Sequence, residues 1–393
     1  MSTPEPDLWR AESLLLKLLK IAGPSCHEAE VAHFVTGELC RAGVPASAIE
    51  TDQAHRRSRC RGDVGNLICR LPGTIRGPRR LFMAHMDTVP LCVGARPIKK
   101  GDYIVPADKH TALGADDRAG VAVVLSTVLE IIRQKLPHPP LTLFFSVQEE
   151  LGLLGTNSAK FSALGKPRLA FNFDGGPCEQ ITMGATGGYR MTADVHGIAS
   201  HAGCHPERGV SAITIASLAI AQLHHDGWLG NISKRSKTGT ANVGVISGGD
   251  ATNVVTPLVQ IRTEARSHDP AFRKQIVAAI EKAFQDAATS VKNEDGRCGS
   301  VEFEGHLDYE SFLLADDDPS LLACEAAVRD VGITPKRKIS DGGLDANWMS
   351  VRLVPTVTMG AGQIEPHTVN ERVDLREFRQ VCRVALRLAT GQH

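Results

Sequence analysis

The chain has 393 residues, of which 42 % are hydrophobic and 22 % are charged, a composition typical of an ordinary globular protein. Lysine plus arginine and aspartate plus glutamate number 44 each, so the chain lacks the excess positive charge of a nucleic-acid-binding protein. A chain of this length exceeds what one hydrophobic core usually organises, and we expect two domains.

The sequence contains no segment that we expect to enter or cross a membrane. Near the N-terminus no basic start precedes an apolar core, and Leu14, Leu15, Leu18 and Leu19 instead mark one face of a helix. The longest apolar stretch, residues 119–129, is too short to span a bilayer. The ten cysteines include no CxxC pair, which argues against a zinc ribbon and a disulfide framework. We therefore expect reduced thiols, a cytoplasmic location and no membrane partner.

Residues 66–174 alternate between predicted strands and a predicted helix. The segments expected to form strands are "NLICRL", "LFMAHM", "LTLFFSV" and "LAFNFD", and the helix is expected over residues 119–134. Because these strand segments are apolar almost throughout, we expect them to be buried on both faces, in a sheet sandwiched by helices.

The pattern changes after residue 186. "GYRMTADVHG" alternates, "SAITIASLAIAQLHH" has helical spacing, and "ANVGVISGG" and "VQIRTEARSHD" alternate again. Asp269 and Pro270 then predict the start of a second helix, which a last strand, "VEFEGHLDYESF", follows. The order β-α-β-β-α-β predicts a ferredoxin-like module over residues 186–308, inserted into a larger α/β domain formed by residues 1–185 and 309–393.

Ionisable side chains follow the predicted strands of the larger domain or precede its helix. They are His85, Asp87, Asp116, Asp117, Glu149, Glu150, Asp174 and, after the strand "PTVTMG", His367. In open α/β sheets, ligands bind beyond the carboxyl ends of the strands, so these side chains can converge in one crevice. Histidines with several carboxylates suit Zn²⁺, Co²⁺ or Mn²⁺.

Ordinary explanations exist for each cluster taken alone. A His-x-Asp pair is often a simple hydrogen bond, an acid after a strand is often only solvated, and an aspartate before a helix is often its N-cap. The N-cap role accounts for one of Asp116 and Asp117, but not for both. The ensemble favours a metal site.

Six motifs occur in order along the chain: "AHMDTVP", "LGADDRAG", "SVQEELGLLG", "FNFDGG", "SHAG" and "EPHTVNE". In order and spacing, from about residue 10 to 385, the sequence resembles the M20 family of metallopeptidases, in particular its peptidase T-like (tripeptide aminopeptidase) branch. The resemblance implies a zinc-exopeptidase-like catalytic domain with a mixed, mostly parallel sheet. It also implies that the inserted βαββαβ module is a lid and dimerisation domain.

The resemblance further implies two zinc ions per subunit, with Co²⁺ or Mn²⁺ as substitutes. By this match His85 and Asp174 hold one zinc, Glu150 and His367 hold the other, and Asp116 bridges them. The peptide bond between Asp116 and the following aspartate is expected to be cis.

The same resemblance assigns the adjacent glutamates different tasks. Glu150 is a ligand, whereas Glu149 is the general base that takes a proton from the metal-activated water. Asp87 is expected to accept the free ring N–H of His85 and so to fix its tautomer, as metal-bound histidines generally require.

Three residues of the inserted module are implied in catalysis or substrate binding. His201 in "SHAG" is expected to stabilise the oxyanion in the partner subunit's site. Asn253 and Arg266 are expected to contact polar groups of the substrate. An arginine suits a peptide carboxylate, although a surface salt bridge is an equally ordinary role for Arg266.

The predicted function is a dimeric two-zinc exopeptidase that hydrolyses the N-terminal peptide bond of di- and tripeptides. An N-acyl-amino-acid deacylase or a carboxypeptidase of the same family is the alternative, because each breaks an amide bond with the same constellation. A metal- or peptide-binding protein without catalysis is a more distant alternative. The preferred side chains and the role of Glu365 do not follow from the sequence.

Overall fold

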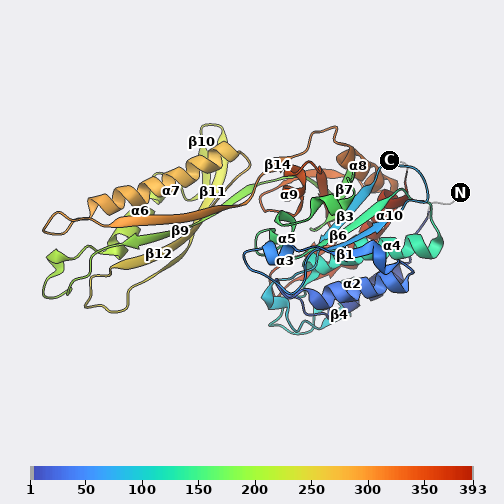
Figure 1. Ribbon diagram of the computed structural model, residues 1–393, viewed down its shortest axis with the longest axis horizontal. Helices are drawn as coiled ribbons and strands as arrows, with labels where there is room; N and C mark the ends of the chain where they lie inside the picture. The colour runs from blue at the N-terminus through green and yellow to red at the C-terminus, as the bar shows by residue number, and fades with distance from the viewer. Residues whose placement is uncertain (1–3, 392–393) are drawn as a thin grey trace. The chain divides into compact units, whose positions relative to one another are not determined.

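The computed structural model describes residues 4–391, and the chain divides into two compact units (Figure 1). Unit 1 comprises Met1–Ala185 and Leu313–His393, and unit 2 comprises Thr186–Phe312. The inserted unit thus begins where the sequence pattern changes and extends slightly beyond the expected end at residue 308.

Unit 1 is organised around a nine-stranded sheet with the order β1-β2-β6-β3-β7-β16-β8-β14, in which β15 also pairs with β8. The strands are β1 Ile49–Thr51, β2 Leu67–Leu71, β3 Arg80–His85, β6 Leu141–Ser146, β7 Leu169–Phe173, β8 Gln180–Ala185, β14 Phe312–Leu313, β15 Lys336–Ser340 and β16 Thr356–Met359. The central strands β6, β3, β7 and β16 are parallel, and all of their residues are buried. These strands confirm the predicted parallel sheet that is buried on both faces.

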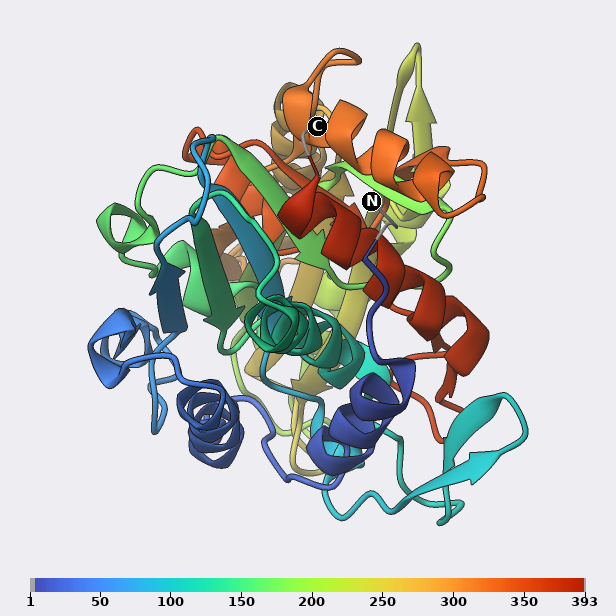
Figure 2. The same cartoon turned by 90° about the vertical axis from the view of Figure 1, so that its right-hand side faces the viewer.

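Alternate residues of β3 pack on opposite faces of this sheet. Leu81 and Met83 belong to a cluster that includes Met349, whereas the ring of Phe82 lies 5.5 Å from that of Phe171 and 5.8 Å from that of Phe173. The helices of unit 1 are α1 Leu8–Leu18, α2 Ala29–Arg41, α3 Ala54–Arg57, α4 Ala115–Gln134, α5 Leu154–Asn157, α8 Pro319–Asp330, α9 Ala346–Val351 and α10 Leu375–Thr390. Helix α4 packs along β3 and β7 and contacts α1, α2 and α10 (Figure 2).

A second, four-stranded sheet of unit 1 was not predicted. Its order is β17-β18-β5-β4, formed by Gln363–Ile364, Arg372–Asp374, Tyr103–Pro106 and Pro97–Lys100. Strands this short contain too few residues to display an alternating pattern, and the turn at Gly101, with φ of 60°, is the clearest local signal. This sheet matters for the site, because the loop from β17 to β18 carries His367.

Unit 2 is a five-stranded antiparallel sheet of order β10-β11-β12-β9-β13. Its elements are β9 Gly187–His196, α6 Ala212–His225, β10 Gly230–Lys234, β11 Lys237–Gly248, β12 Leu258–Ser267, α7 Pro270–Ser290 and β13 Ser300–Tyr309. Without β10 this is the predicted βαββαβ order. The extra strand forms a hairpin with β11 and was not predicted, because Ile232 is its one buried residue.

Helices α6 and α7 supply one side of the core of unit 2. Buried residues of both helices pack with inward-facing residues of the strands in one hydrophobic cluster. Asp269 caps α7 by accepting hydrogen bonds from the N–H groups of Ala271 and Phe272, at 2.8 and 3.1 Å, and Pro270 occupies its first turn. The predicted start of this helix is therefore confirmed.

Within residues 4–391, no helix has the length and apolar character needed to cross a membrane. All ten cysteines lie in this range, and each is a free thiol. Cys178, which follows Asp174 closely in sequence, is buried, and burial raises the pKa of its thiol above the ordinary range. Because a neutral, buried thiol is a poor nucleophile, Cys178 contributes to packing rather than to chemistry.

Candidate metal centre

All five side chains expected to bind metal belong to unit 1, at strand ends or at the start of α4. His85 ends β3, Glu150 follows β6, Asp174 follows β7, Asp116 opens α4, and His367 lies between β17 and β18. Ligand atoms of His85, Asp116 and Glu150 lie within 4.8 Å of one another. The parallel arrangement of β6, β3 and β7 produces this convergence, because their carboxyl ends share one edge of the sheet.

Asp116 lies between the two histidines. Its Oδ1 is 3.0 Å from Nε2 of His85, and its Oδ2 is 3.4 Å from Nε2 of His367. The same Nε2 of His367 lies 2.8 Å from Oε1 of Glu150. One carboxylate therefore offers an oxygen to each histidine, which is the arrangement that a bridging ligand requires.

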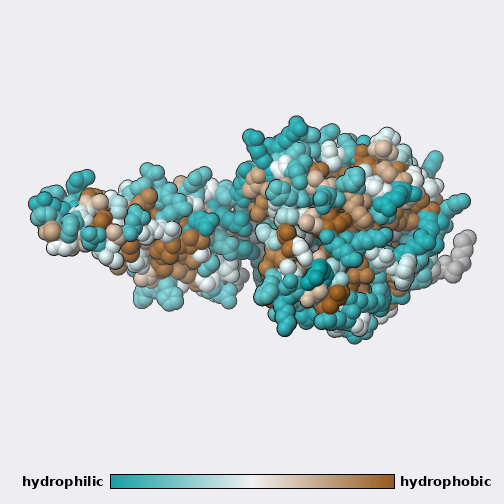
Figure 3. All heavy atoms as spheres, turned by 90° about the horizontal axis from the view of Figure 1, so that it is seen from below, coloured by the Kyte–Doolittle hydropathy of each residue, from teal (hydrophilic) through white to brown (hydrophobic). Residues whose placement is uncertain are grey.

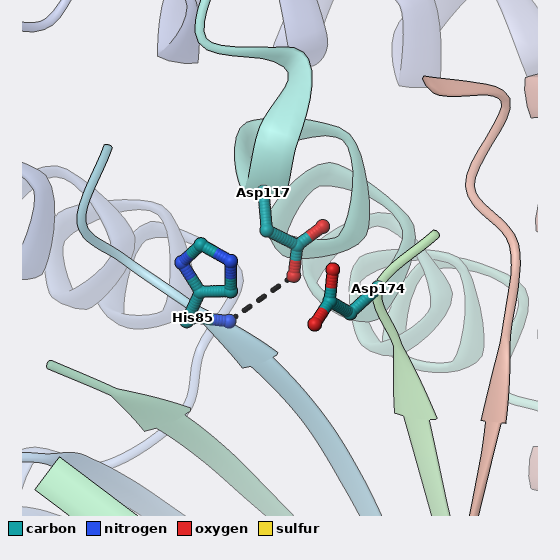
Figure 4. Close-up of side chains that lie close together, drawn as sticks. All are labelled: His85, Asp117 and Asp174. Carbon is teal, nitrogen blue, oxygen red and sulfur yellow. Dashed lines mark hydrogen bonds between the residues drawn. The ribbon is translucent and has the colours of Figure 1, made fainter. Parts of the chain in front are cut away.

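His85, Asp117 and Asp174 form a second group of ligand atoms within 4.8 Å of one another, and their side chains approach one another in Figure 4. Both oxygens of Asp117 are already engaged. Oδ1 accepts from Gly120 N at 2.9 Å and from Gln363 Nε2 at 2.8 Å, and Oδ2 accepts from the main-chain N of His85 at 3.1 Å. Asp117 is thus the N-cap of the regular part of α4.

The backbone at the start of α4 explains why adjacent aspartates take different roles. The peptide bond between Asp116 and Asp117 is cis, as expected, and neither residue has helical backbone angles. Asp116 extends toward the histidines, whereas Asp117 turns back to the helix and to β3.

The tautomer of His85 follows from its hydrogen bonds. Its Nδ1 is 3.1 Å from the main-chain oxygen of Asp87, which can only accept, so Nδ1 carries a proton. The Asp87 carboxylate lies slightly farther away, with Oδ1 at 3.4 Å. The main-chain carbonyl is the nearer acceptor, and the Asp87 carboxylate expected from the resemblance lies close to the same nitrogen.

The carboxylate of Asp87 also fixes the segment that carries the two glutamates. It accepts hydrogen bonds from Glu149 N at 3.0 Å, Glu150 N at 3.2 Å and the Ser25 hydroxyl at 2.7 Å. Asp87 is fully buried, so these bonds have little competition from water. One buried carboxylate thus holds both glutamates beside the histidines.

The electrostatics of the group show an excess of negative charge. Burial, followed by the nearby Asp116, raises the pKa of Asp174 to about 8. Burial also raises the pKa of Glu149 well above its ordinary value and that of Glu150 to a smaller extent. Hydrogen bonds that the His367 ring donates to Asp116 and Glu150 raise the pKa of His367 to about 10. Protons are held here because buried carboxylates lie close to one another.

His85 gives the clearest indication of what this group of residues accommodates. Burial lowers its pKa, but the hydrogen bonds to Asp116 and Asp87 outweigh burial and raise the pKa well above the ordinary value. With Nδ1 donating to a carbonyl, a neutral His85 would direct the lone pair of Nε2 at a carboxylate oxygen 3.0 Å away. Two acceptors at this distance require a proton or a metal cation between them. The donor set of imidazole nitrogens and carboxylates fits a divalent metal.

Several residues that support this group were not predicted. Glu28 accepts from Gln148 N at 3.0 Å, Gln363 donates to Asp117, and Glu371 accepts from the loop before α4. Asp345, which is buried, accepts a hydrogen bond from the hydroxyl of Ser146 at the end of β6. "NERVD" places Glu371 close to His367 in sequence, but nothing in that pattern indicates burial.

The remaining predicted residues belong to unit 2. His201 is exposed, and its Nδ1 accepts from the N–H groups of Gly203 and Cys204 at 3.2 and 3.1 Å. The ring proton of a neutral His201 therefore resides on Nε2, which is then available as a donor. The main-chain oxygen of Asn253 accepts from Ala202 N at 2.9 Å, so these two segments are neighbours.

Arg266 has a partner within unit 2. Its Nε and one terminal nitrogen donate to the two carboxylate oxygens of Glu264, each at 3.1 Å. The guanidinium is partly buried, with 28 % of the side chain exposed, so it retains a face toward solvent. The pair with Glu264 was one of the two roles considered for this residue.

Comparison with known proteins connects this geometry to a family. The model of Peptidase family M20/M25/M40 matches residues 81–391. The chain belongs to this family. As an M20 peptidase it is a peptide hydrolase, and the match includes every residue of the metal group described above.

Two solved structures resemble this M20 peptidase along nearly its whole length. A tripeptidase from Staphylococcus aureus has a TM-score of 0.89 and 28 % identity, and the match covers 98 % of this chain and 99 % of that one. The aminopeptidase PepT from Bacillus cereus has a TM-score of 0.84 and 32 % identity, with 98 % of each chain covered. The protein YqjE of Bacillus subtilis is 32 % identical over 92 % of this chain and 93 % of its own.

Proposed function

We propose that this M20 peptidase is a two-zinc exopeptidase that releases the N-terminal residue from di- and tripeptides. The observation that carries the metal proposal is the contact between Nε2 of His85 and Asp116 Oδ1 at 3.0 Å, while Nδ1 donates elsewhere. The similarity to a tripeptidase and to an aminopeptidase supports the peptide class. Co²⁺ or Mn²⁺ would suit the same donors.

Five side chains would hold the metals. His85 and Asp174 would bind one ion, Glu150 and His367 the other, and Asp116 would lie between them with one oxygen toward each histidine. When bound, the metals supply Lewis acidity, which polarises a peptide carbonyl and makes water more acidic. Their positive charge would also replace the protons that the group otherwise retains.

Glu149 is the proposed general base. It accepts the proton of the attacking water and delivers it to the amine that leaves. Only 8 % of the residue is exposed, and burial raises its pKa, which favours the carboxyl group holding a proton before delivering it to the amine. Asp87 holds its main chain at 3.0 Å, which restricts the direction from which the carboxylate reaches the substrate.

The residues of unit 2 would complete the site. His201 is proposed to donate from Nε2 to the oxyanion, since its Nδ1 is occupied by two backbone donors. Asn253 and Arg266 are proposed to contact polar groups of the peptide. Arg266 would then bind substrate through the part of its guanidinium that Glu264 leaves free.

A comparison of three forms of one peptide tests the proposed specificity. The substrate is a tripeptide with free ends, its N-acetylated form and its C-amidated form, each followed by chromatography of the products. We expect cleavage of the first peptide bond of the free and amidated forms and strong loss of kcat/KM for the acetylated form. Preference for the acetylated form would indicate a deacylase, and cleavage of the last bond would indicate a carboxypeptidase.

We also propose that the chain forms a homodimer through unit 2 and acts in the cytoplasm. Unit 2 exposes apolar side chains, and hydrophobic residues gather on the face of it that Figure 3 shows. Exposed large residues of this unit are Ile213, Leu218, Ile246, Val254, Leu258 and Leu307. The free thiols are consistent with a reducing compartment.

Mixing two inactive variants tests whether His201 acts in the partner subunit. Dimers of one Glu149→Ala chain and one His201→Ala chain should contain one site in which both residues are intact. We expect activity to return in purified heterodimers and to be absent from either homodimer. Heterodimers without activity would place His201 in the site of its own chain, whereas an active His201→Ala homodimer would place it outside catalysis.

A further inference from the structure

Glu371 is a buried carboxylate with a specific position beside the proposed bridge. It follows β17 and the loop of His367, and only 1 % of the residue is exposed. Its Oε2 accepts hydrogen bonds from Leu113 N at 2.8 Å and from Gly114 N at 2.7 Å. Its Oε1 accepts from Asp116 N at 3.0 Å. Both oxygens are therefore used by backbone donors on one short segment.

These three hydrogen bonds hold the backbone of Asp116 and of the residues just before it. The Asp116 carboxylate contacts the rings of His85 and His367, which are themselves proposed ligands. Because these histidines are themselves proposed ligands, the direction of the Asp116 side chain is set mainly by its own backbone. Glu371 fixes that backbone at the residue itself and at the residues before it. Asp117, through its bonds to Gly120 and His85, fixes the segment on the other side.

Glu371 also joins two ligand-bearing loops. Its own N–H donates to the main-chain oxygen of Thr368 at 3.1 Å, which closes a turn directly after His367. The carboxylate of the same residue binds the loop of Asp116, far away in sequence. Movement of either loop would disturb the other, so this side chain, together with the Gln363 amide that donates to Ala115 O and Asp117 Oδ1, helps to set the separation of Asp116 and His367.

We propose that Glu371 is a positioning residue that sets the geometry of the bridging carboxylate and thereby the affinity for both metals. The inference rests on the two-metal function proposed above. A simpler role for Glu371 is that of a helix cap, since a carboxylate near the first turn of a helix stabilises that helix by itself. Experiment can distinguish the two roles. A cap affects stability, whereas a positioning residue also affects metal affinity.

The test substitutes Glu371→Gln and measures zinc binding by competition with a chromophoric chelator. If the amide oxygen keeps the bonds from Leu113 and Gly114, the amide NH₂ faces Asp116 N–H, and two donors then oppose each other. Residues that orient metal ligands typically contribute about 10–100-fold to metal affinity. We expect zinc affinity to fall by about this factor. The melting temperature of the metal-free protein should fall as well, because a buried hydrogen bond is lost.

A second variant separates hydrogen bonding from charge. Glu371→Asp keeps the negative charge near the helix but is shorter by one methylene, so it cannot reach all three donors. We expect it to bind zinc as weakly as Glu371→Gln. Recovery of wild-type affinity would mean that charge alone is sufficient and would overturn the proposal.

Asp318→Asn is the matched control, because Asp318 accepts from Ser320 N and Leu321 N, at 2.8 and 3.3 Å, at the start of α8. It should leave zinc affinity unchanged. Equal zinc affinity in wild type, Glu371→Gln and Asp318→Asn would refute the role of Glu371 while leaving the two-metal function intact. A wild-type protein that binds no pair of zinc ions would instead refute the proposed function itself. Should Glu371→Gln not fold, the Asp variant alone decides the outcome through the same titration.

Discussion

Ionisable side chains are arranged differently on the sheet of unit 2 and in the metal group of unit 1. On the sheet of unit 2, charges pair with opposite charges: Arg190 lies 2.8 Å from Asp308, which is also 2.8 Å from His306. In unit 1, the carboxylates at the ends of the central strands face one another and share the two histidines as their nearby cationic partners. The paired charges of unit 2 are complete within the protein, whereas the group in unit 1 retains protons or requires added positive charge.

Topology accounts for part of this difference. Parallel strands direct their carboxyl ends to one edge, so residues after β3, β6 and β7 meet there regardless of their charge. In the antiparallel sheet, side chains of neighbouring strands lie side by side and can be matched pair by pair, as Arg190 of β9 and Asp308 of β13 are. The cluster of like-charged carboxylates in unit 1 is therefore a stronger indication of function than the paired charges on the sheet of unit 2.

The largest expected effect comes from exchanging the adjacent glutamates for glutamines one at a time. Glu149→Gln removes the proposed base, so turnover should fall by at least about 10²–10⁴-fold while zinc content remains near that of the wild type. Glu150→Gln removes an anionic ligand, so zinc content should fall and added zinc should restore part of the activity. Metal analysis of both purified variants, with activity at several zinc concentrations, measures the difference. Zinc loss in Glu149→Gln, or the same response to zinc in both, would show that the two residues do not divide the work in this way.

A smaller effect is expected in unit 2, where Arg266 already has a partner. If Arg266 also binds substrate, Arg266→Gln should raise KM about tenfold or more, since a hydrogen bond from a charged group is lost, and zinc content should not change. Glu264→Gln is the control, because it removes the partner and keeps the guanidinium. If steady-state kinetics give the same KM for wild type and Arg266→Gln, Arg266 does not bind substrate and serves only in its ion pair with Glu264.

The smallest effect on activity is expected for Glu28, a buried carboxylate of unit 1 outside the proposed ligand set, whose effect is on stability. Burial, followed by the charge of Asp87, raises its pKa from 4.5 to about 8. Between these values the unfolded chain loses a proton that the folded protein keeps, so rising pH favours unfolding over this window. Chemical denaturation of the metal-free protein should show wild type losing stability relative to Glu28→Gln from pH 5 to 8. Parallel curves for the two proteins would mean that Glu28 is already ionised in the folded state.

Much of the fold followed from the sequence because hydrophobic pattern and burial agree closely in the central strands. β3 and β6 are apolar runs, and all of their residues are buried. The candidate positions could be predicted for the same reason, since His85 ends one recognisable strand and Glu150 lies shortly after another. Which of the candidates bind metal was implied by the resemblance to the M20 family. The short strands β17 and β18 could not be predicted, because two or three residues carry no usable period.

The supporting residues could not be predicted because their environment is created by distant segments. In sequence Glu371 resembles any surface glutamate, yet it is buried by a loop that lies more than two hundred residues earlier. The different tasks of Asp116 and Asp117 likewise depend on backbone angles that their identities do not specify. The local sequence pattern therefore located the candidate ligand side chains, whereas the residues that orient them depend on tertiary contacts.

Titration of metal-free protein with zinc tests the central claim most directly. Activity toward a free tripeptide and bound zinc are measured together as zinc is added in steps. The arrangement of Asp116 between His85 and His367 predicts that activity rises until two zinc ions are bound per chain and is negligible without metal. Full activity in the metal-free protein, or a maximum at a single zinc per chain, would contradict a site bridged by Asp116.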